Sequence, residues 1–208
     1  MPRQTPTFSM AAMTALLALA LTACSPAFNW REVRPDNTRL SLLLPCKPDK
    51  AQKTVPLGGQ PTVLAMLGCD AGGATFAVAV ADLGDAAKVG PVLAQWQSLT
   101  LANMKAGPRA AGPGPGGTQV VPLKLSGASA EPAPLLVSAQ GQRADGTAVT
   151  GRAAYFAQGS QVFQVVMYAG TTKRDGAPQA VEVAETFSPA SSSNKSNAIP
   201  QQSHKIKT

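Results

Sequence analysis

Few side chains in this 208-residue chain are of the kinds that carry out catalysis. The single histidine, His204, lies close to the C-terminus. A folded core without imidazole cannot form the Ser-His-Asp or Cys-His arrangements on which many hydrolases depend. Asp82 and Asp85 are near one another, but both flank the predicted start of a helix, where capping accounts for them. We therefore expect no catalytic site, no metal site and no cofactor.

Cys24 is the most informative of the three cysteines. It follows an apolar run from Met10 to Leu21, with Arg3 upstream and no acid before it. A basic start, a short apolar segment and small residues before a cleavage point are typical of a secretory signal peptide. The apolar run is too short to cross a bilayer, which takes about 20 residues. The sequence therefore predicts export of the chain.

The end of this leader, Leu-Thr-Ala-Cys at 21–24, resembles the lipobox of bacterial lipoproteins. The resemblance implies that residues 1–23 are removed and that Cys24 becomes the lipidated N-terminus. Two acyl chains are enough for stable anchoring. Ser25 rather than Asp follows the cysteine, which under the enterobacterial sorting rule implies the outer membrane. The implied location is the periplasmic side of the cell envelope, with the membrane as a partner through the lipid.

The other two cysteines, Cys46 and Cys69, are expected to form a structural disulfide. Exported chains enter an oxidising compartment, and the spacing of these two fits no zinc pattern. Cys46 ends one predicted strand and Cys69 ends another, so the two sulfurs meet if those strands are neighbours. Two separate buried thiols are the alternative.

Residues 24–38 are predicted to be a short tether between the anchor and the domain. The tether holds Trp30, Arg31 and Arg34. Indole and guanidinium groups are typical of the lipid headgroup layer, so one interpretation places these three side chains at the membrane interface. In the other interpretation, Trp30 folds back onto the domain.

Alternating apolar positions predict an antiparallel sheet, and longer apolar periods predict two helices. A first strand is expected over 39–46, a tight hairpin at Gly58-Gly59, and a meander of three strands within 135–169. The stripe of the first helix consists of Val89, Val92, Leu93, Trp96, Leu99 and Met104. The stripe of the second helix, which begins at Pro178, consists of Ala180, Val183, Ala184 and Phe187.

These elements indicate a single α+β domain over 39–188, with an antiparallel sheet of six or seven strands and two helices packed on it. The element order resembles the PsbP-like fold, as do the phrases Leu44-Pro-Cys-Lys-Pro48 and Ala184-Glu-Thr-Phe187. This resemblance implies a binding or assembly module rather than an enzyme.

The charge distribution argues against a nucleic-acid partner. The chain has 18 Lys and Arg residues against 11 Asp and Glu residues. Part of this excess lies in the polar tail 189–208, which we expect to be disordered. No stripe of cations with interleaved aromatic residues is present in the sequence. The sequence therefore predicts a lipid-anchored binding or envelope-assembly module with another envelope protein as partner. The alternative is a hydrolase or transferase with an unrecognised site.

Overall fold

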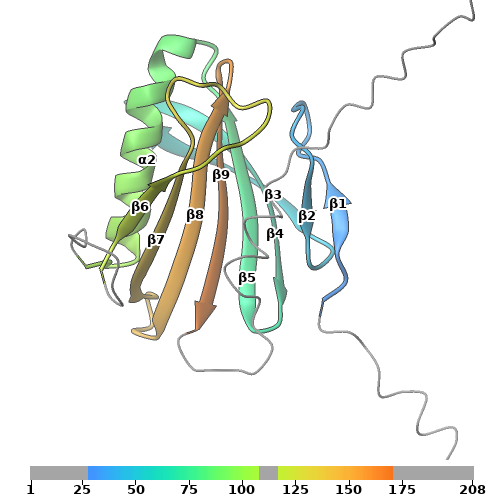
Figure 1. Ribbon diagram of the computed structural model, residues 1–208, viewed down its shortest axis with the longest axis vertical. Helices are drawn as coiled ribbons and strands as arrows, with labels where there is room; N and C mark the ends of the chain where they lie inside the picture. The colour runs from blue at the N-terminus through green and yellow to red at the C-terminus, as the bar shows by residue number, and fades with distance from the viewer. Residues whose placement is uncertain (1–27, 108–116, 171–208) are drawn as a thin grey trace, which may run out of the picture.

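A computed structural model describes residues 28–107 and 117–170 (Figure 1). These residues form a seven-stranded antiparallel sheet in the order β3-β4-β5-β9-β8-β7-β6 and a separate two-stranded sheet, β1-β2. The strands are β1 Arg31–Val33, β2 Leu42–Leu44, β3 Asp49–Leu57, β4 Gln60–Ala71, β5 Ala74–Asp82, β6 Gln119–Pro122, β7 Leu135–Gln142, β8 Ala148–Gln158 and β9 Gln161–Gly170. The helical elements are the 3₁₀ turn η1 Ala86–Lys88 and the α-helix α2 Val89–Asn103.

The seven-stranded sheet is made of two meanders that meet at its centre. Strands β3 to β5 precede the helix and strands β6 to β9 follow it, and β5 pairs with β9. Gly58 and Gly59 have φ angles of 65° and 74°, and they form the two-residue turn between β3 and β4. Such a turn needs two residues in the left-handed region, which glycine adopts readily. The predicted hairpin is confirmed.

Helix α2 covers one face of this sheet (Figure 1). Its residues Val89, Val92, Leu93 and Trp96 are buried, as the apolar stripe predicted. Leu99 does not fit the prediction, because its side chain is 43% exposed. The helix turns by about 100° per residue, which brings Thr100 rather than Leu99 toward the sheet, where its hydroxyl contacts Gln164.

The β1-β2 hairpin covers the opposite face. Leu40, Leu42 and Leu44 are buried there against Phe76, Phe163 and other core residues, which confirms the predicted apolar face of 39–46. The hairpin is a second layer rather than part of the large sheet, since β2 pairs only with β1 among the described strands.

Several expectations change or lie outside the described residues. The described part of the chain is α+β, with one α-helix rather than the two expected. The predicted second helix, the leader 1–23, Cys24 and the tail 189–208 all lie outside it. Residues 28–38, expected to be tether, belong to the fold, because β1 pairs with β2 and Val33 packs on the core.

The C-terminal end of α2 approaches the backbone of β7 and β8 closely. The backbone N–H of Gln142 donates to Met104 O at 2.7 Å. A Cβ atom at Gly141 would lie 2.1 Å from Met104 O, and one at Gly151 would lie 2.6 Å from Met104 Cε. Both glycines therefore make room for the helix end.

We predict that Gly141→Ala lowers the free energy of unfolding by about 1–3 kcal/mol, because backbone must shift to admit the methyl group. Gly151→Ala should be milder, since the flexible end of Met104 can move aside. Gly90→Ala, where nothing lies within 4 Å of the added atom, is the control. Urea unfolding of the three variants measures the loss of unfolding free energy in each and so tests the predicted order. An equal or larger loss for Gly151→Ala would contradict this account of the contact.

Candidate functional site

The first described residues after the predicted anchor pack against one end of the large sheet. Phe28 lies over the turn between β4 and β5, where a Cβ atom at Gly72 would come within 2.3 Å of the Phe28 ring. The backbone N–H of Asn29 donates to Pro45 O at 2.7 Å. The chain is thus fixed to the domain from Phe28 onward, and only glycine at position 72 leaves space for that ring.

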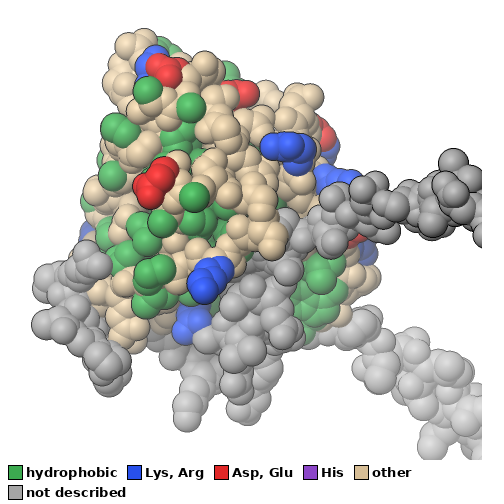
Figure 2. All heavy atoms as spheres, turned by 45° about the horizontal axis from the view of Figure 1, so that its top comes forward, with side chains coloured by type: hydrophobic (Ala, Val, Ile, Leu, Met, Phe, Trp, Pro, Cys, Tyr) green, Lys and Arg blue, Asp and Glu red, His purple; other side chains and the backbone are tan. Residues whose placement is uncertain are grey.

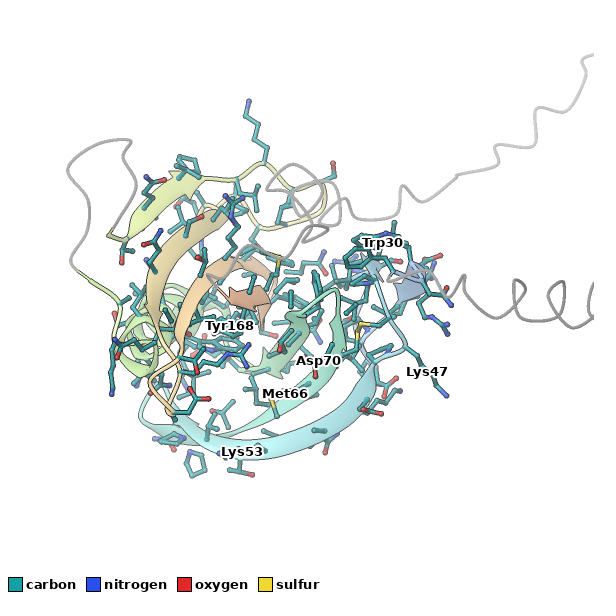
Figure 3. All side chains as sticks on the ribbon, turned by 90° about the horizontal axis from the view of Figure 1, so that it is seen from below. Trp30, Lys47, Lys53, Met66, Asp70 and Tyr168 are labelled. Atoms are coloured by element: carbon teal, nitrogen blue, oxygen red, sulfur yellow. A yellow bond between two sulfur atoms is a disulfide. The ribbon has the colours of Figure 1, made fainter. Side chains whose placement is uncertain are left out.

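Trp30 lies beside Phe28 with its ring centroid 6.3 Å away and the two rings 28° from parallel. Trp30 is half-buried. Its ring lies at the outer side of the fold in the view from below (Figure 3). Trp30 therefore folds back onto the domain, which is one of the two interpretations that the sequence left open, and part of the ring stays accessible.

The two arginines of the predicted tether differ in their surroundings. Arg31 is exposed beside Trp30. The Arg34 guanidinium pairs with the Glu32 carboxylate at 2.7 Å, and the Ser41 hydroxyl donates to the same carboxylate. The hydrogen bond from Ser41, followed by the bond and charge of Arg34, lowers the pKa of Glu32. Arg34 is thus already engaged by an acid, whereas Arg31 has no ion pair among the described residues.

Cys46 and Cys69 form the predicted disulfide, with their Cα atoms 6.0 Å apart (Figure 3). The condition on which the sequence argument brought the two sulfurs together, that the two strands are neighbours in one sheet, is not met. Cys46 follows β2 in the β1-β2 layer, and Cys69 lies in β4 of the large sheet. The strands next to β4 are β3 and β5, so β2 is not its neighbour. The bridge therefore fastens the β1-β2 layer onto the sheet.

We call this part of the molecule, which follows the predicted anchor in sequence, the anchor-proximal end and define it as residues 28–31, 45–47 and 69–74. The end of β9 belongs to the same side of the sheet, because Ala74 pairs with Ala169. The exposed side chains of Lys47 and Asp70 lie on this side together with Trp30 (Figure 3). Asp70 accepts a hydrogen bond from the Thr75 hydroxyl at 2.6 Å.

The opposite end of the sheet carries a pocket of about 330 Å³ between the Gly58-Gly59 turn and the start of α2. Asp82 accepts hydrogen bonds there from Gly84 N–H at 2.9 Å and from the Ser160 hydroxyl at 2.8 Å. The bond from Gly84 and then that from Ser160 lower the pKa of Asp82. With this end turned forward, hydrophobic side chains gather between singly placed charged groups (Figure 2).

A buried polar cluster under α2 was not foreseen from the sequence. Gln164 Nε2 lies 2.9 Å from both Thr100 Oγ1 and Tyr155 Oη and donates to them. The one available signal was a polar residue within the apolar strand 162–167. The cluster ties the middle of the helix to the centre of the sheet.

The tyrosines near this cluster are unsuited to act as bases at neutral pH. Burial, followed by the nearby Tyr155, raises the pKa of Tyr168 to about 12. Burial also raises the pKa of Tyr155, against the hydrogen bonds from Thr100 and Gln164. Within residues 28–107 and 117–170, no three His, Cys, Asp or Glu side chains gather in a way that would hold a metal ion. None of the helices in these ranges has the length and apolar character to span a membrane.

Comparisons with known proteins add little. Neither a family model nor a curated protein matches the sequence. One similar solved structure is a Pseudomonas aeruginosa protein of unknown function described as a regulator candidate, with TM-score 0.34, 16% identity, and coverage of 69% of this chain and 84% of that one. Another is an uncharacterised Mycobacterium smegmatis protein, with TM-score 0.36, 14% identity, and coverage of 82% and 90%. Both likenesses are too slight to assign a fold or an activity.

We predict that replacing both Cys46 and Cys69 by Ala lowers the free energy of unfolding by about 3 kcal/mol, because the unfolded chain is no longer closed into a loop. Denaturant unfolding of the mature protein measures this loss. Thiol titration of the denatured, unreduced wild type should find neither thiol free. Two free thiols, or unchanged stability in the double variant, would refute a stabilising bridge.

Alkaline pH should weaken the fold through Tyr168. Its pKa is raised in the folded state, so the stability it contributes is complete below its ordinary value of about 10 and is lost as pH rises through about 12. The chain has two tyrosines, so Tyr168→Phe leaves Tyr155 as the single absorbing phenolate. Phenolate absorbance and unfolding, followed together, test this. Titration of Tyr168 at the ordinary value in the folded protein would show that the ring is not buried as described.

Proposed function

We propose that the protein is a lipid-anchored binding or assembly module on the periplasmic side of the cell envelope, with the outer membrane as its site. The observation that carries the proposal is the short distance in sequence between the lipobox-like 21–24 and Phe28, the first described residue, which is already packed on the domain. In this proposal residues 1–23 are the signal peptide and Cys24 carries the lipid.

The length of the connection limits how the domain stands on the membrane. Four Cα–Cα steps separate Cys24 from Phe28, and they span at most about 14 Å when fully extended. The anchor-proximal end must then lie close to the bilayer surface. Trp30 and Arg31 are placed to contact the headgroups, because an indole suits that layer and a guanidinium is attracted to anionic lipid. Arg34 contributes less, since Glu32 neutralises it.

The same limit leaves the opposite end of the sheet free for a partner. The pocket beside Gly58 and the β8-β9 turn at Gly159 lie away from the anchor. A protein component of the envelope would be met there or along the sides of the sheet. No observation on the described residues favours the alternative, a hydrolase or transferase.

Two finer features of the fold belong to this proposal. We place a second helix at 178–187, whose apolar stripe would pack on the sheet after the chain leaves β9 at Gly170. The likeness to the PsbP-like fold rests on the same element order.

The lipid anchor is tested by feeding cells an alkyne analogue of palmitate and comparing the wild type with Cys24→Ser. We expect labelled, processed protein for the wild type, and unlabelled protein with its leader retained for Cys24→Ser. Ser25→Ala, which keeps the acyl acceptor, is the matched control and should label normally. Undiminished labelling of Cys24→Ser would overturn the anchor.

A further inference from the structure

The outer face of the β1-β2 hairpin is a surface that no described element covers (Figure 1). Leu42 and Leu44 are buried against the large sheet, whereas Leu43 between them is 44% exposed. Successive side chains of a strand alternate between its two faces, so Leu43 points away from the sheet. The layer that follows the predicted anchor in sequence therefore holds a large apolar side chain outward.

Trp30 lies on the same outer face as Leu43. The register places Leu43 opposite Glu32. The bond from Asn29 N–H to Pro45 O continues the pairing of the two segments beyond the end of β1. Residues two apart in an extended chain share a face, so Trp30 is on the side of Glu32 and diagonal to Leu43, about 7–8 Å away. The half-buried indole and the exposed leucine thus form one small apolar patch.

The acids of this layer are paired with cations. The charged residues within 28–47 are four cations and two acids: Arg31, Arg34, Arg39, Lys47, Glu32 and Asp36. The Glu32 carboxylate lies 2.7 Å from the Arg34 guanidinium, and the Asp36 carboxylate lies 2.8 Å from Lys50 Nζ. Neither acid therefore leaves an unbalanced negative charge beside the apolar patch.

The remaining cations of the layer have no such partner. Arg31, Arg39 and Lys47 are exposed and make no ion pair among the described residues. Arg31 and Lys47 lie at the base of the hairpin, and Arg39 lies in the segment that joins its two strands. Figure 3 shows Trp30 and Lys47 at the outer rim of the fold. The apolar patch therefore has free cations at both ends of the hairpin.

The opposite face of the neighbouring strands has a different charge. On the α2 face of β3 and β4, the charged side chains are Asp49, Lys53 and Asp70, two acids and one cation. Lys105 and Arg143 are two further cations near this end, but they lie beside β7, at the other side of the sheet. Of the two faces next to the predicted anchor, the hairpin face is therefore the one that an anionic surface attracts.

The position of the predicted anchor favours a lipid surface as what meets this face. Cys24 is four Cα–Cα steps from Phe28, at most about 14 Å, and the hairpin begins directly after Phe28. The disulfide and the buried leucines fix the hairpin on the sheet, so its outer face has one direction relative to the domain. Binding of a protein surface to a bilayer grows with the apolar area that it buries and with its attraction to anionic lipid. The hairpin face offers both.

We infer that the outer face of the β1-β2 hairpin lies on a bilayer that contains anionic phospholipid. Leu43 and Trp30 enter the headgroup layer, and Arg31, Arg39 and Lys47 contact lipid phosphates. The inference deepens the proposed function and rests on it for the place of the anchor. It commits the domain to lie with the hairpin toward the membrane and α2 away from it.

The first test places a nitroxide at Leu43→Cys in the acylated protein on vesicles of phosphatidylcholine and phosphatidylglycerol. Leu99→Cys is the matched control, because Leu99 is 43% exposed and lies on α2. On vesicles, we expect the label at 43 to lose accessibility to a water-soluble nickel complex and to gain accessibility to oxygen, whereas the label at 99 should not change. Equal exposure of both labels to nickel on vesicle-bound protein would overturn the inference, and would also be the result if a protein partner covered the hairpin instead.

The second test uses the mature chain made without its lipid and measures sedimentation with the same vesicles. Leu43→Asp should weaken binding about tenfold, because an apolar contact is replaced by a charge that the lipid repels. Leu99→Asp should bind like the wild type. Arg39→Glu should weaken binding at least about fivefold on anionic vesicles.

Three results of the sedimentation test would overturn the inference. They are absence of binding to the anionic vesicles, equal binding to vesicles of phosphatidylcholine alone, and wild-type binding by Leu43→Asp. This chain carries no lipid, so the outcome does not depend on acyl labelling at Cys24. Failure of the anchor and failure of the hairpin face can therefore be told apart.

Discussion

The antiparallel pairing of β5 with β9 is the constraint on which the rest of the structure depends. It runs from Ala74 opposite Ala169 to Asp82 opposite Gln161 and joins two meanders that are separated by the helix. Because side chains alternate along a strand, this register also decides what each face presents. Ala79 and Ala81 face α2, and their small side chains let the helix approach. Phe76, Val78 and Val80 face the other way and fill the space beneath the β1-β2 hairpin.

The hairpin layer connects the core of the domain to its N-terminus. It rests on the apolar face of the sheet, and the Cys46–Cys69 bridge fastens it covalently to β4. Phe28, which precedes the hairpin, packs against Gly72 at the same end of the sheet. A lipid on Cys24 would therefore hold the folded domain close to the membrane, because only a short connection separates Cys24 from Phe28. This short connection is what gives the proposed orientation, with the pocket beside Gly58 away from the membrane, its physical basis.

Local features of this fold could be predicted from the sequence, and non-local ones could not. The Gly58-Gly59 hairpin, the meander 135–169 and the apolar stripe of α2 follow from turn chemistry and periodicity. The pairing of Cys46 with Cys69 followed from the oxidising compartment, whereas the parity argument for it does not apply, because the two cysteines belong to different layers. The position of 39–46 outside the main sheet could not be predicted. It depends on pairing with β1, and the sequence around β1 has no apolar pattern that indicates a strand. The packing of Phe28 against Gly72 could not be predicted either. It is possible because glycine has no Cβ atom, and no spacing rule in the sequence reveals such a contact.

The orientation at the membrane is tested most directly by the two tryptophans, since Trp30 lies at the anchor-proximal end and Trp96 is buried on the side of α2 that faces the sheet. Trp96→Phe leaves Trp30 as the only indole, and Trp30→Phe leaves Trp96. Fluorescence of the two acylated variants is measured on vesicles with nitroxide-bearing lipid headgroups. The account predicts strong quenching of Trp30 and little quenching of Trp96. Equal quenching of both, or an unquenched Trp30 on a protein shown to be acylated and vesicle-bound, would contradict it.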